Sequence, residues 1–409
     1  MKTGPAEKHD PFFFLSLPYR LSELGGKSHK VCLALAAILV IGLPMQAQSL
    51  KEKALKYWNK ALQPNPSLDS TRIFQPAKRW SFRVGYEMRQ VGASIRSDFS
   101  IRTPDVAYDF TLTQTLQDRA AHHIGFNVGF GPVSLGYSHE VGRKEGVSSG
   151  LSFAYQGTFW GASFRYSKFS SRIQENMELT LPDNPDYDSA SSFLSLDPGE
   201  MVNLIVDGYY AFNRHRFSYS AAYDGKTIQR KSTGSWIVGA KYMQGGFKLQ
   251  PTESVLLDIS EGIGQYSTYQ FSLGGGYSFN WVLFHRDAES RQNPARLRNL
   301  TLNLTAMPML TVFTRTVTRQ YTETGFFQYS DEIAESLAMT GNIQPNFMAS
   351  AGLNWSLGHF YLNLWTDYSM FRFYNGKRHY QTRDTTPFDM GQSGNFTNFR
   401  VNFSLSYRF

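Results

Sequence analysis

The last thirteen residues of the chain, Thr397 to Phe409, alternate strictly between apolar and polar side chains. Successive side chains of an extended strand point to opposite faces, so this alternation places all of the apolar residues on one face. The chain ends on an aromatic residue, and a second aromatic residue lies two positions before it. The segment therefore predicts a strand whose two faces meet different environments. The apolar face carries Phe399, Val401, Phe403, Leu405, Tyr407 and Phe409, and the polar face carries Asn398, Arg400, Asn402, Ser404, Ser406 and Arg408.

The same period of two recurs along most of the chain and predicts about twelve strands, an even number as single-chain bacterial membrane barrels require. Together with the terminal pattern, which resembles the insertion signal of Gram-negative outer-membrane barrels, it predicts an all-β, transmembrane, antiparallel up-and-down barrel. The other eleven strands are expected at Trp80–Arg89, Ile124–Phe130, Val133–Tyr137, Val147–Tyr155, Trp160–Tyr166, Val202–Phe212, Trp236–Tyr242, Tyr269–Trp281, Leu300–Leu310, Phe347–Leu357 and Phe360–Phe371.

The connections between these strands fit a barrel with short periplasmic turns and long outer loops. The connections at Gly131-Pro132, Gln156–Thr158 and Gly358-His359 are short. Most connections at the other end are long, and loops are expected over Gly92–Ala121, Phe169–Met201, Met243–Thr268, Thr311–Asn346 and Arg372–Phe396. Two inner connections, Asn213–Gly234 and Val282–Asn299, are also long, so a barrel of fourteen strands is the alternative.

Composition agrees with this fold class. Mean hydropathy is −0.36, which argues against a helical membrane protein, whereas 15% aromatic residues and 34 glycines fit many short strands. A membrane barrel conceals its apolar surface in such averages because only every second residue faces lipid. A soluble two-sheet sandwich would also alternate, but so many strands of about ten residues favour the barrel.

The chain before the barrel divides into two predicted parts. The apolar run Val31–Pro44 is too short to span a bilayer and predicts a secretory signal over residues 1–47, with a lone helical anchor as the alternative. Residues 48–79 predict a short periplasmic amphipathic helix and a linker, which either lie against the barrel base or enter the lumen. Residues 80–409 form the barrel. Cys32 is the only cysteine, so the mature chain can have no disulfide or thiolate site.

A family resemblance is carried by one central segment. The residues Tyr209–Asn213, Phe217–Tyr223 and Gln229–Trp236 resemble the signature of an uncharacterised Gram-negative outer-membrane family, one of the domains of unknown function. The resemblance implies a secreted barrel in the cell outer membrane from about Trp80 to Phe409. It supplies no catalytic, metal or cofactor residues.

The residues themselves predict no cofactor, no metal site and no nucleic-acid partner. His122 and His123 are adjacent and would face opposite sides of a strand, and no nucleotide-binding fingerprint is present. The neighbours Ser138 and His139 would also point apart, which weakens the alternative of a lipid-acting barrel enzyme. We therefore expect a non-enzymatic, transport-like or structural barrel, with a surface-loop scaffold for partner binding as a further alternative.

Charged residues on the inward face form the first candidate site. Glu87 on the first strand and Arg400 on the last should meet in the lumen when the barrel closes, near the outer ends of their strands. Such a set either forms a structural ion-pair network or a charged constriction that selects solutes. The predicted lumen charges are Arg83, Glu87, Arg89, Arg165, Asp207, Lys241, Asp367 and Arg400.

Asn213–Gly234 forms the second candidate site, because it is basic and aromatic and holds a single acidic residue, Asp224. It predicts a plug that folds back into the barrel or a docking segment for a periplasmic partner, with a long solvated turn as the alternative. The residues expected to act are Arg214, His215, Arg216, Phe217, Tyr219, Tyr223, Arg230 and Lys231.

The remaining expected partners are outer-membrane lipid and the barrel-assembly machinery. Removal of residues 1–47 leaves 36 Lys and Arg against 30 Asp and Glu, a mild excess of six positive charges that suits anionic headgroups. Recognition by the assembly machinery is expected at the outward residues of the last strand. The predicted insertion signal consists of Phe403, Leu405, Tyr407 and Phe409.

Overall fold

The computed structural model describes residues 67–76, 80–102, 107–117, 120–142, 148–171, 174–180, 192–195, 199–248, 262–290, 293–325, 328–341, 343–380 and 388–409. The expected signal peptide, the expected amphipathic helix and Cys32 lie outside the described residues. Within these ranges, no helix has the length and the apolar character needed to cross a membrane.

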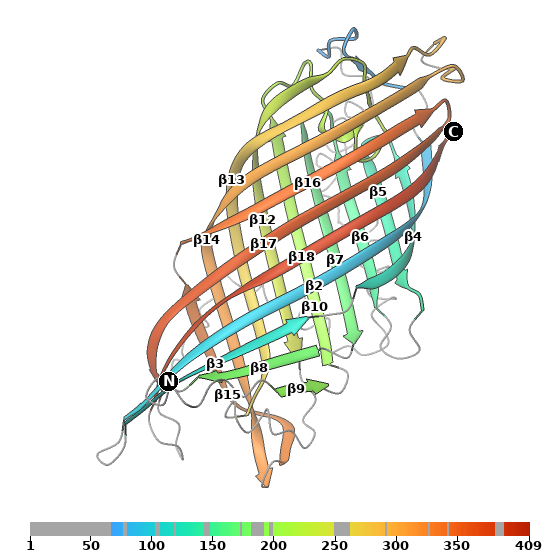
Figure 1. The fold of residues 1–409 in the computed structure, drawn as a ribbon. Helices are drawn as coiled ribbons and strands as arrows, with labels where there is room; N and C mark the ends of the chain where they lie inside the picture. The colour runs from blue at the N-terminus through green and yellow to red at the C-terminus, as the bar shows by residue number, and fades with distance from the viewer. Residues whose placement is uncertain are drawn as a thin grey trace, which may run out of the picture. The chain divides into compact units, whose positions relative to one another are not determined.

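Twelve antiparallel strands form a closed barrel (Figure 1). Each strand pairs with the next one in the ring, and the last pairs with the first through the partners Leu405 and Val84. The predicted twelve-stranded barrel is confirmed, and each predicted strand falls on one of these. The ring runs β2 (Trp80–Arg102), β4 (Ala121–Phe130), β5 (Val133–Glu140), β6 (Ser149–Gln156), β7 (Trp160–Ser171), β10 (Gly199–Ala211), β12 (Thr233–Lys248), β13 (Ile263–Arg286), β14 (Arg298–Gly325), β16 (Gln344–Leu357), β17 (Phe360–Tyr380) and β18 (Phe388–Arg408).

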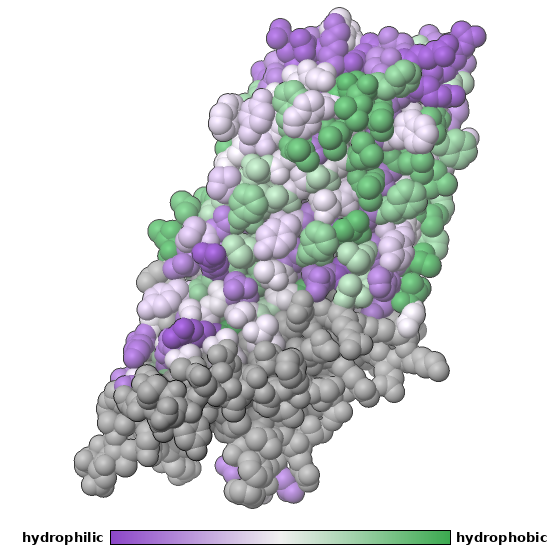
Figure 2. Space-filling view, viewed as in Figure 1, coloured by the Kyte–Doolittle hydropathy of each residue, from purple (hydrophilic) through white to green (hydrophobic). Residues whose placement is uncertain are grey.

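The three short turns lie at one end of the barrel, which is the periplasmic end by the rule of short inner turns. Apolar side chains cover the outer wall. On β13, Phe271, Leu273 and Tyr277 are exposed on the outside, whereas Ser272 and Ser278 on the other face of the strand are buried in the interior. Figure 2 shows hydrophobic residues over the wall and hydrophilic residues gathered at the periplasmic rim. This arrangement suits a wall that faces lipid.

The prediction of long loops at the outer end of the barrel is wrong over much of their length, because strands continue through these ranges. A strand of about ten residues spans a membrane, but β14 has 28 residues and β13 has 24. The strands continue beyond the membrane because their backbone groups go on pairing with neighbours. Additional strands extend this outer sheet: β3 (Ala107–Gln117) on β2, β8 (Gln174–Thr180) on β3, β9 (Ser192–Ser195) on β8, and β15 (Gln328–Gly341) on β14.

The alternative of fourteen strands is also wrong. The described residues of the two long inner connections, 212–232 and 287–297, add no strand to the ring. The first contains the short 3-10 helix η3 (Tyr219–Ala221) and the two-residue strand β11 (Ile228–Gln229). β11 pairs with β1 (Ile73–Phe74), which precedes the barrel. The backbone of this connection is therefore satisfied by a small separate sheet and by the barrel interior.

Candidate functional site

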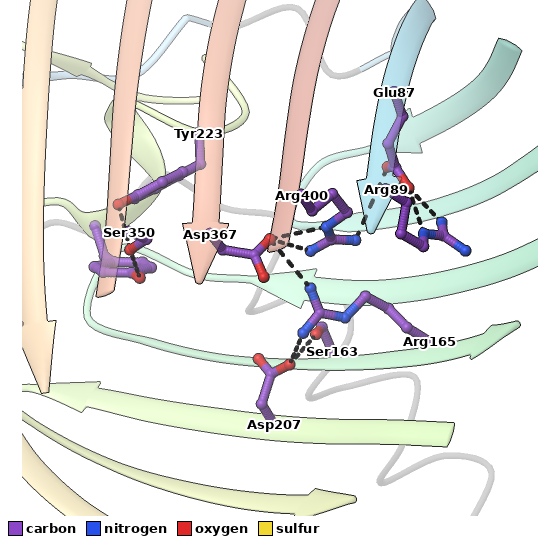
Figure 3. Close-up of polar contacts among 10 residues, drawn as sticks. Glu87, Arg89, Ser163, Arg165, Asp207, Tyr223, Ser350, Asp367 and Arg400 are labelled. Atoms are coloured by element: carbon purple, nitrogen blue, oxygen red, sulfur yellow. Dashed lines mark hydrogen bonds and ion pairs between the residues drawn. The ribbon is translucent and has the colours of Figure 1, made fainter. Parts of the chain in front are cut away.

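A chain of ion pairs joins the first and last strands of the barrel inside the lumen (Figure 3). Glu87 accepts a hydrogen bond from Arg89 Nε at 2.9 Å, and its other oxygen lies 3.9 Å from Arg400 Nη1. Arg400 donates to Asp367 Oδ1 from Nε at 2.8 Å and from Nη2 at 2.6 Å. Glu87 and Arg400 thus meet in the lumen. They lie well inside their long strands, so their expected position near the outer strand ends is wrong.

The chain then crosses the barrel. Arg165 Nη1 lies 4.0 Å from Asp367 Oδ1, and Arg165 Nη2 donates to Asp207 at 2.7 Å. Asp207 also accepts from Ser163 Oγ at 2.8 Å. The strands β7 and β17, which carry Arg165 and Asp367, are six places apart in the ring of twelve. Three arginines and three carboxylates therefore form one continuous polar layer from wall to wall.

Lys241 lies beside this layer but is not bonded to it. Its side chain is 2% exposed, and its ammonium lies 4.9 Å from the centre of the Phe371 ring. Ile205, Met243 and Phe371 form a buried apolar cluster against which Phe396 packs. Each of these residues lies on the outer side of the charged layer along its own strand, so the cluster borders that layer on the side away from the periplasm.

The connection 212–232, called the plug below, fills the periplasmic end of the barrel. Phe217 is fully buried in a cluster with Ala211, Ile237, Met307 and Met309 of the wall. The Tyr219 ring contacts the Tyr209 ring in a tilted arrangement at a centroid distance of 4.3 Å and stacks on the Tyr223 ring at 4.9 Å. The predicted plug or docking residues Phe217, Tyr219 and Tyr223 therefore all lie inside the barrel.

Polar side chains from several strands hold the plug backbone and the plug tyrosines. Tyr223 Oη donates to Asn303 Oδ1 at 2.6 Å and lies 2.8 Å from Ser350 Oγ. Asn363 and Asn280 donate to the carbonyl oxygens of Tyr223 and Ser218, each at 2.8 Å. Further along the ring, on β2 and β18, Arg83 Nη2 donates to the Asp224 carbonyl at 3.1 Å and Arg408 donates to the Gly225 carbonyl. Lys226 Nζ of the plug donates to the Val133 carbonyl of β5 at 3.2 Å.

Two titratable groups of the plug are perturbed by this environment. Burial raises the pKa of the Asp224 carboxyl, against the opposing effect of the Lys226 ammonium, which lies 3.7 Å away. Burial likewise lowers the pKa of Lys226, and Asp224 again opposes the shift. Keeping both groups charged inside the closed plug therefore requires free energy of desolvation, which the attraction between Asp224 and Lys226 partly offsets.

The remaining basic residues of the plug lie at the periplasmic rim. Arg230 lies 2.7 Å from Asp287 Oδ1, and its guanidinium stacks on the Phe74 ring at 5.1 Å. Slight burial raises the pKa of Asp287, but the His285 hydrogen bond and the Arg230 charge outweigh it, so the net shift is downward. The other rim residues are Arg214, His215 with Nδ1 2.6 Å from the Ser67 carbonyl, Arg216 with Nε 4.0 Å from Asp69, and the exposed Lys231.

A cavity of about 280 Å³ lies between the plug and the walls, and the charged layer lines it. Many of the residues that line it along β4 to β7 are small, although Arg165 of β7 also lines it, whereas β2, β17 and β18 contribute charged side chains that include Glu87, Asp367 and Arg400. Sequence reasoning missed this cavity, although the signal is present in the alternating small residues. The small lining residues are Gly125, Ser134, Gly136, Ser138, Gly150, Ser152, Ala154, Ala162 and Ser163.

A serine and a histidine, Ser148 and His123, lie within hydrogen-bond distance of each other. His123 Nε2 lies 2.8 Å from Ser148 Oγ, and the Ser148 amide donates to Glu140. Both His123 and Ser148 are buried and neither lines the cavity, so the pair offers no accessible nucleophile. Ser138 lines the cavity, but its neighbour His139 stacks on Tyr137 at the outer wall. No cluster of metal-ligating side chains occurs among the described residues.

The expected insertion residues all lie on the outer wall at the periplasmic end of β18. Phe403 and Phe409 are each 51% exposed, Leu405 is 48% exposed and Tyr407 is 40% exposed. The Tyr407 ring stacks against Phe409 with centroids 6.0 Å apart. Recognition of these residues during insertion stays a prediction.

The closed ring, its apolar outer wall and its polar lumen define a transmembrane β-barrel of the outer-membrane type. Residues 97–409 match the model of the family described as a domain of unknown function, DUF4421, and the chain belongs to this family. The resemblance to an uncharacterised outer-membrane family is thereby confirmed.

No curated protein matches the chain. Among solved structures, the outer-membrane protease OmpT from Escherichia coli is similar, with 8% identity, a TM-score of 0.32, and coverage of 80% of this chain and 97% of that one. The β domain of the Bordetella autotransporter BrkA has 10% identity, a TM-score of 0.29, and coverage of 79% and 99%. OprG from Pseudomonas aeruginosa has 8% identity, a TM-score of 0.26, and coverage of 81% and 98%.

Proposed function

We propose that the protein is a transport barrel held closed by its own chain, with the plug as its periplasmic gate. The observation that carries the proposal is the lumen cavity of about 280 Å³, which is lined by charged groups and closed on the periplasmic side by residues 212–232. A purely structural barrel needs no such polar cavity. Solutes would pass when the plug withdraws.

The character of the plug contacts supports a gate. Asn280, Asn303 and Asn363 bind the plug through hydrogen bonds. A hydrogen bond that is exchanged for one to water has a net free energy of only about 0.5 to 1.5 kcal/mol, so such contacts can open and reform. The apolar anchors of the plug are the cluster around Phe217 and a smaller cluster in which Ile228 packs with Phe74 and Leu297. The ion-pair layer between Arg165 and Asp367 would form a second barrier that selects by charge.

Conductance in planar lipid bilayers tests this proposal. Residues 213–232 are replaced by a short glycine-serine turn, and the same replacement is made together with Asp367→Asn, which weakens the second barrier. The wild-type barrel should be nearly silent, and the plug-less barrels should show stable pores. The heat-dependent shift of folded barrels on gels controls for folding. Folded plug-less barrels that stay silent in both backgrounds would reject the proposal.

A surface scaffold for partner binding is the second candidate, because the outer sheet continues far beyond the membrane span. β2, β14 and β18 have 23, 28 and 21 residues, about two to three times what a membrane strand needs. This outer sheet would present a rigid binding surface. Shortening β14 and β15 together between Thr314 and Gly341 should then abolish partner binding without changing conductance in the plug-less background.

A further inference from the structure

We infer that the lumen cavity binds a small organic anion with an apolar body, and that Lys241 holds its negative charge. The inference names the solute class for the proposed transport function and rests on that function for its biological meaning. The binding step itself depends only on the cavity.

The first argument is the charge balance of the cavity. Its lining contains five cationic side chains, Arg83, Arg89, Arg165, Lys241 and Arg400, but only three carboxylates, those of Glu87, Asp207 and Asp367. Each carboxylate already accepts a hydrogen bond from an arginine. The difference of five and three leaves two positive charges in excess, so an anion is the complementary ligand.

Lys241 carries one of these excess charges without a direct partner. Among the described residues, no carboxylate or other acceptor lies within bonding distance of its ammonium, which lies over the Phe371 ring at 4.9 Å from the ring centre. Asp207 and Asp367 attract it at longer range but are bonded to Arg165 and Arg400. A cation that is 98% buried is costly unless an anion pairs with it. Because Lys241 also lines the cavity, a ligand there can reach it.

The part of the lining next to Lys241 on its periplasmic side selects for an apolar body. Tyr209, Tyr219 and Tyr223 present three rings in contact, and Met307 and Met348 add polarisable apolar surface. Aromatic and methionine side chains bind flat apolar groups well. A fully hydrated inorganic anion would leave this surface without a complementary contact. The lining therefore favours a carboxylate attached to a ring or a short chain.

The small residues of β4 to β7 set the size of the ligand. At Gly136 and Gly150 a Cβ would lie within 3 Å of the hydroxyl of Ser152 and of Ser138, so a larger side chain at either position would displace a residue that lines the cavity. The cavity volume of about 280 Å³ is roughly twice that of an engineered protein cavity of about 150 Å³ that takes up benzene. A ligand of one or two rings with one carboxylate fits this volume.

Isothermal titration of the full-length, detergent-solubilised barrel tests the inference, with benzoate and 2-naphthoate as probes. Benzamide serves as the uncharged control, and chloride and phosphate serve as inorganic competitors. At least one carboxylate should bind the wild type, benzamide should bind at least tenfold more weakly, and Lys241→Met should weaken carboxylate binding at least tenfold. Lys231→Met removes an exposed lysine at the rim and should leave binding unchanged. Ser152→Leu should block binding by filling the cavity.

The inference is overturned if neither carboxylate binds the folded wild type, if Lys241→Met binds as well as Lys231→Met, or if chloride and phosphate displace the probes at equal concentration. These results are distinguishable from failure of the proposed gate. Carboxylate binding by a barrel that never conducts would retain the site and reject transport. Conductance of the plug-less barrel without carboxylate binding would retain transport and reject the site.

Discussion

Arg165 on β7 and Asp367 on β17 meet across the lumen, with Nη1 and Oδ1 4.0 Å apart, although their strands are six places apart in the ring. The same carboxylate oxygen of Asp367 accepts two hydrogen bonds from Arg400 of the neighbouring strand. Asp367 is therefore the point at which the two walls of the barrel are joined electrostatically. Its removal should affect both walls at once.

We expect Asp367→Asn to lower the resistance of the folded barrel to heat. The change leaves Arg165 and Arg400 facing each other with one carboxylate fewer, and breaking a buried ion pair costs about 3 to 5 kcal/mol when no water enters. The cavity beside the pair has room for water, so the free energy of unfolding should fall by an amount near the lower end of this range. The measurement is the temperature at which the folded band disappears on gels.

Asp98→Asn is the matched control for this change. Asp98 pairs with Arg96 at 3.0 Å on the outer part of β2, but their side chains are 38% and 58% exposed. Exposed pairs contribute about 0.2 to 1 kcal/mol, so the unfolding temperature should hardly change. If Asp98→Asn and Asp367→Asn lower the unfolding temperature equally, the charged layer in the lumen does not stabilise the barrel more than an exposed ion pair does.

Arg400→Ala should also destabilise the barrel, and the structure identifies which second change restores it. Arg400 bonds Asp367 at 2.6 to 2.8 Å but lies 3.9 Å from Glu87, which keeps its own bond to Arg89. Asp367→Asn in the Arg400→Ala background should therefore recover more heat resistance than Glu87→Gln does. A double-mutant cycle on each pair measures the two coupling energies. A larger recovery from Glu87→Gln would show that the order of the two contacts is reversed.

Barrel closure can be tested by cysteine pairs on β2 and β18. Glu87 is directly opposite Asn402 in the register, whereas Arg400 is opposite Arg89. Residues directly opposite each other in an antiparallel pair lie about 4.5 to 5.5 Å apart between Cα atoms, within the range of a disulfide. Cysteines at 87 and 402 should crosslink in the folded barrel, and cysteines at 87 and 400, a diagonal pair, should crosslink poorly. The reverse result would indicate a register shifted by two residues.

The sequence could predict the ring because lipid on one face and polar lumen on the other impose a period of two on every strand. It could also predict that Glu87 and Arg400 approach each other, since closure makes their strands neighbours. It could not predict the contact between Arg165 and Asp367, because strand order alone does not show how far long side chains reach across a lumen. Nor could it distinguish the outer strand extensions from loops, since outside the membrane the apolar and polar faces are no longer separated by lipid.

The contacts of the plug could not be predicted from the sequence either. Its basic and aromatic composition indicated a segment that contacts something specific, but the partners are distributed over many strands. Asn280, Asn303 and Asn363 are ordinary inward residues of their strands, and no local pattern marks them as plug contacts. Only the closed ring brings these amides together around one connection.

The final prediction concerns Gly225, which fixes the seat of the plug. Its φ is +65°, and a Cβ at this position would lie 2.7 Å from the Tyr361 ring. Gly225→Ala should therefore add both the cost of a left-handed backbone, about 1 to 2 kcal/mol, and a clash with a buried ring. The plug should loosen while the ring stays folded. Trypsin should then cut after Lys226 or Arg230 in barrels that still migrate as folded on gels.

Two companion variants separate the causes. Gly142→Ala adds an alanine at φ +90° where no atom would lie within 4 Å of its Cβ, so it carries the backbone cost without the clash and should leave the plug resistant to trypsin. Tyr361→Ala in the Gly225→Ala background removes the clash but keeps the backbone cost, and it also removes the ring on which Arg408 stacks at 5.1 Å. Only partial recovery of trypsin resistance is therefore expected. If Gly225→Ala barrels are cut no faster than Gly142→Ala barrels, the plug is not seated through Gly225 against Tyr361.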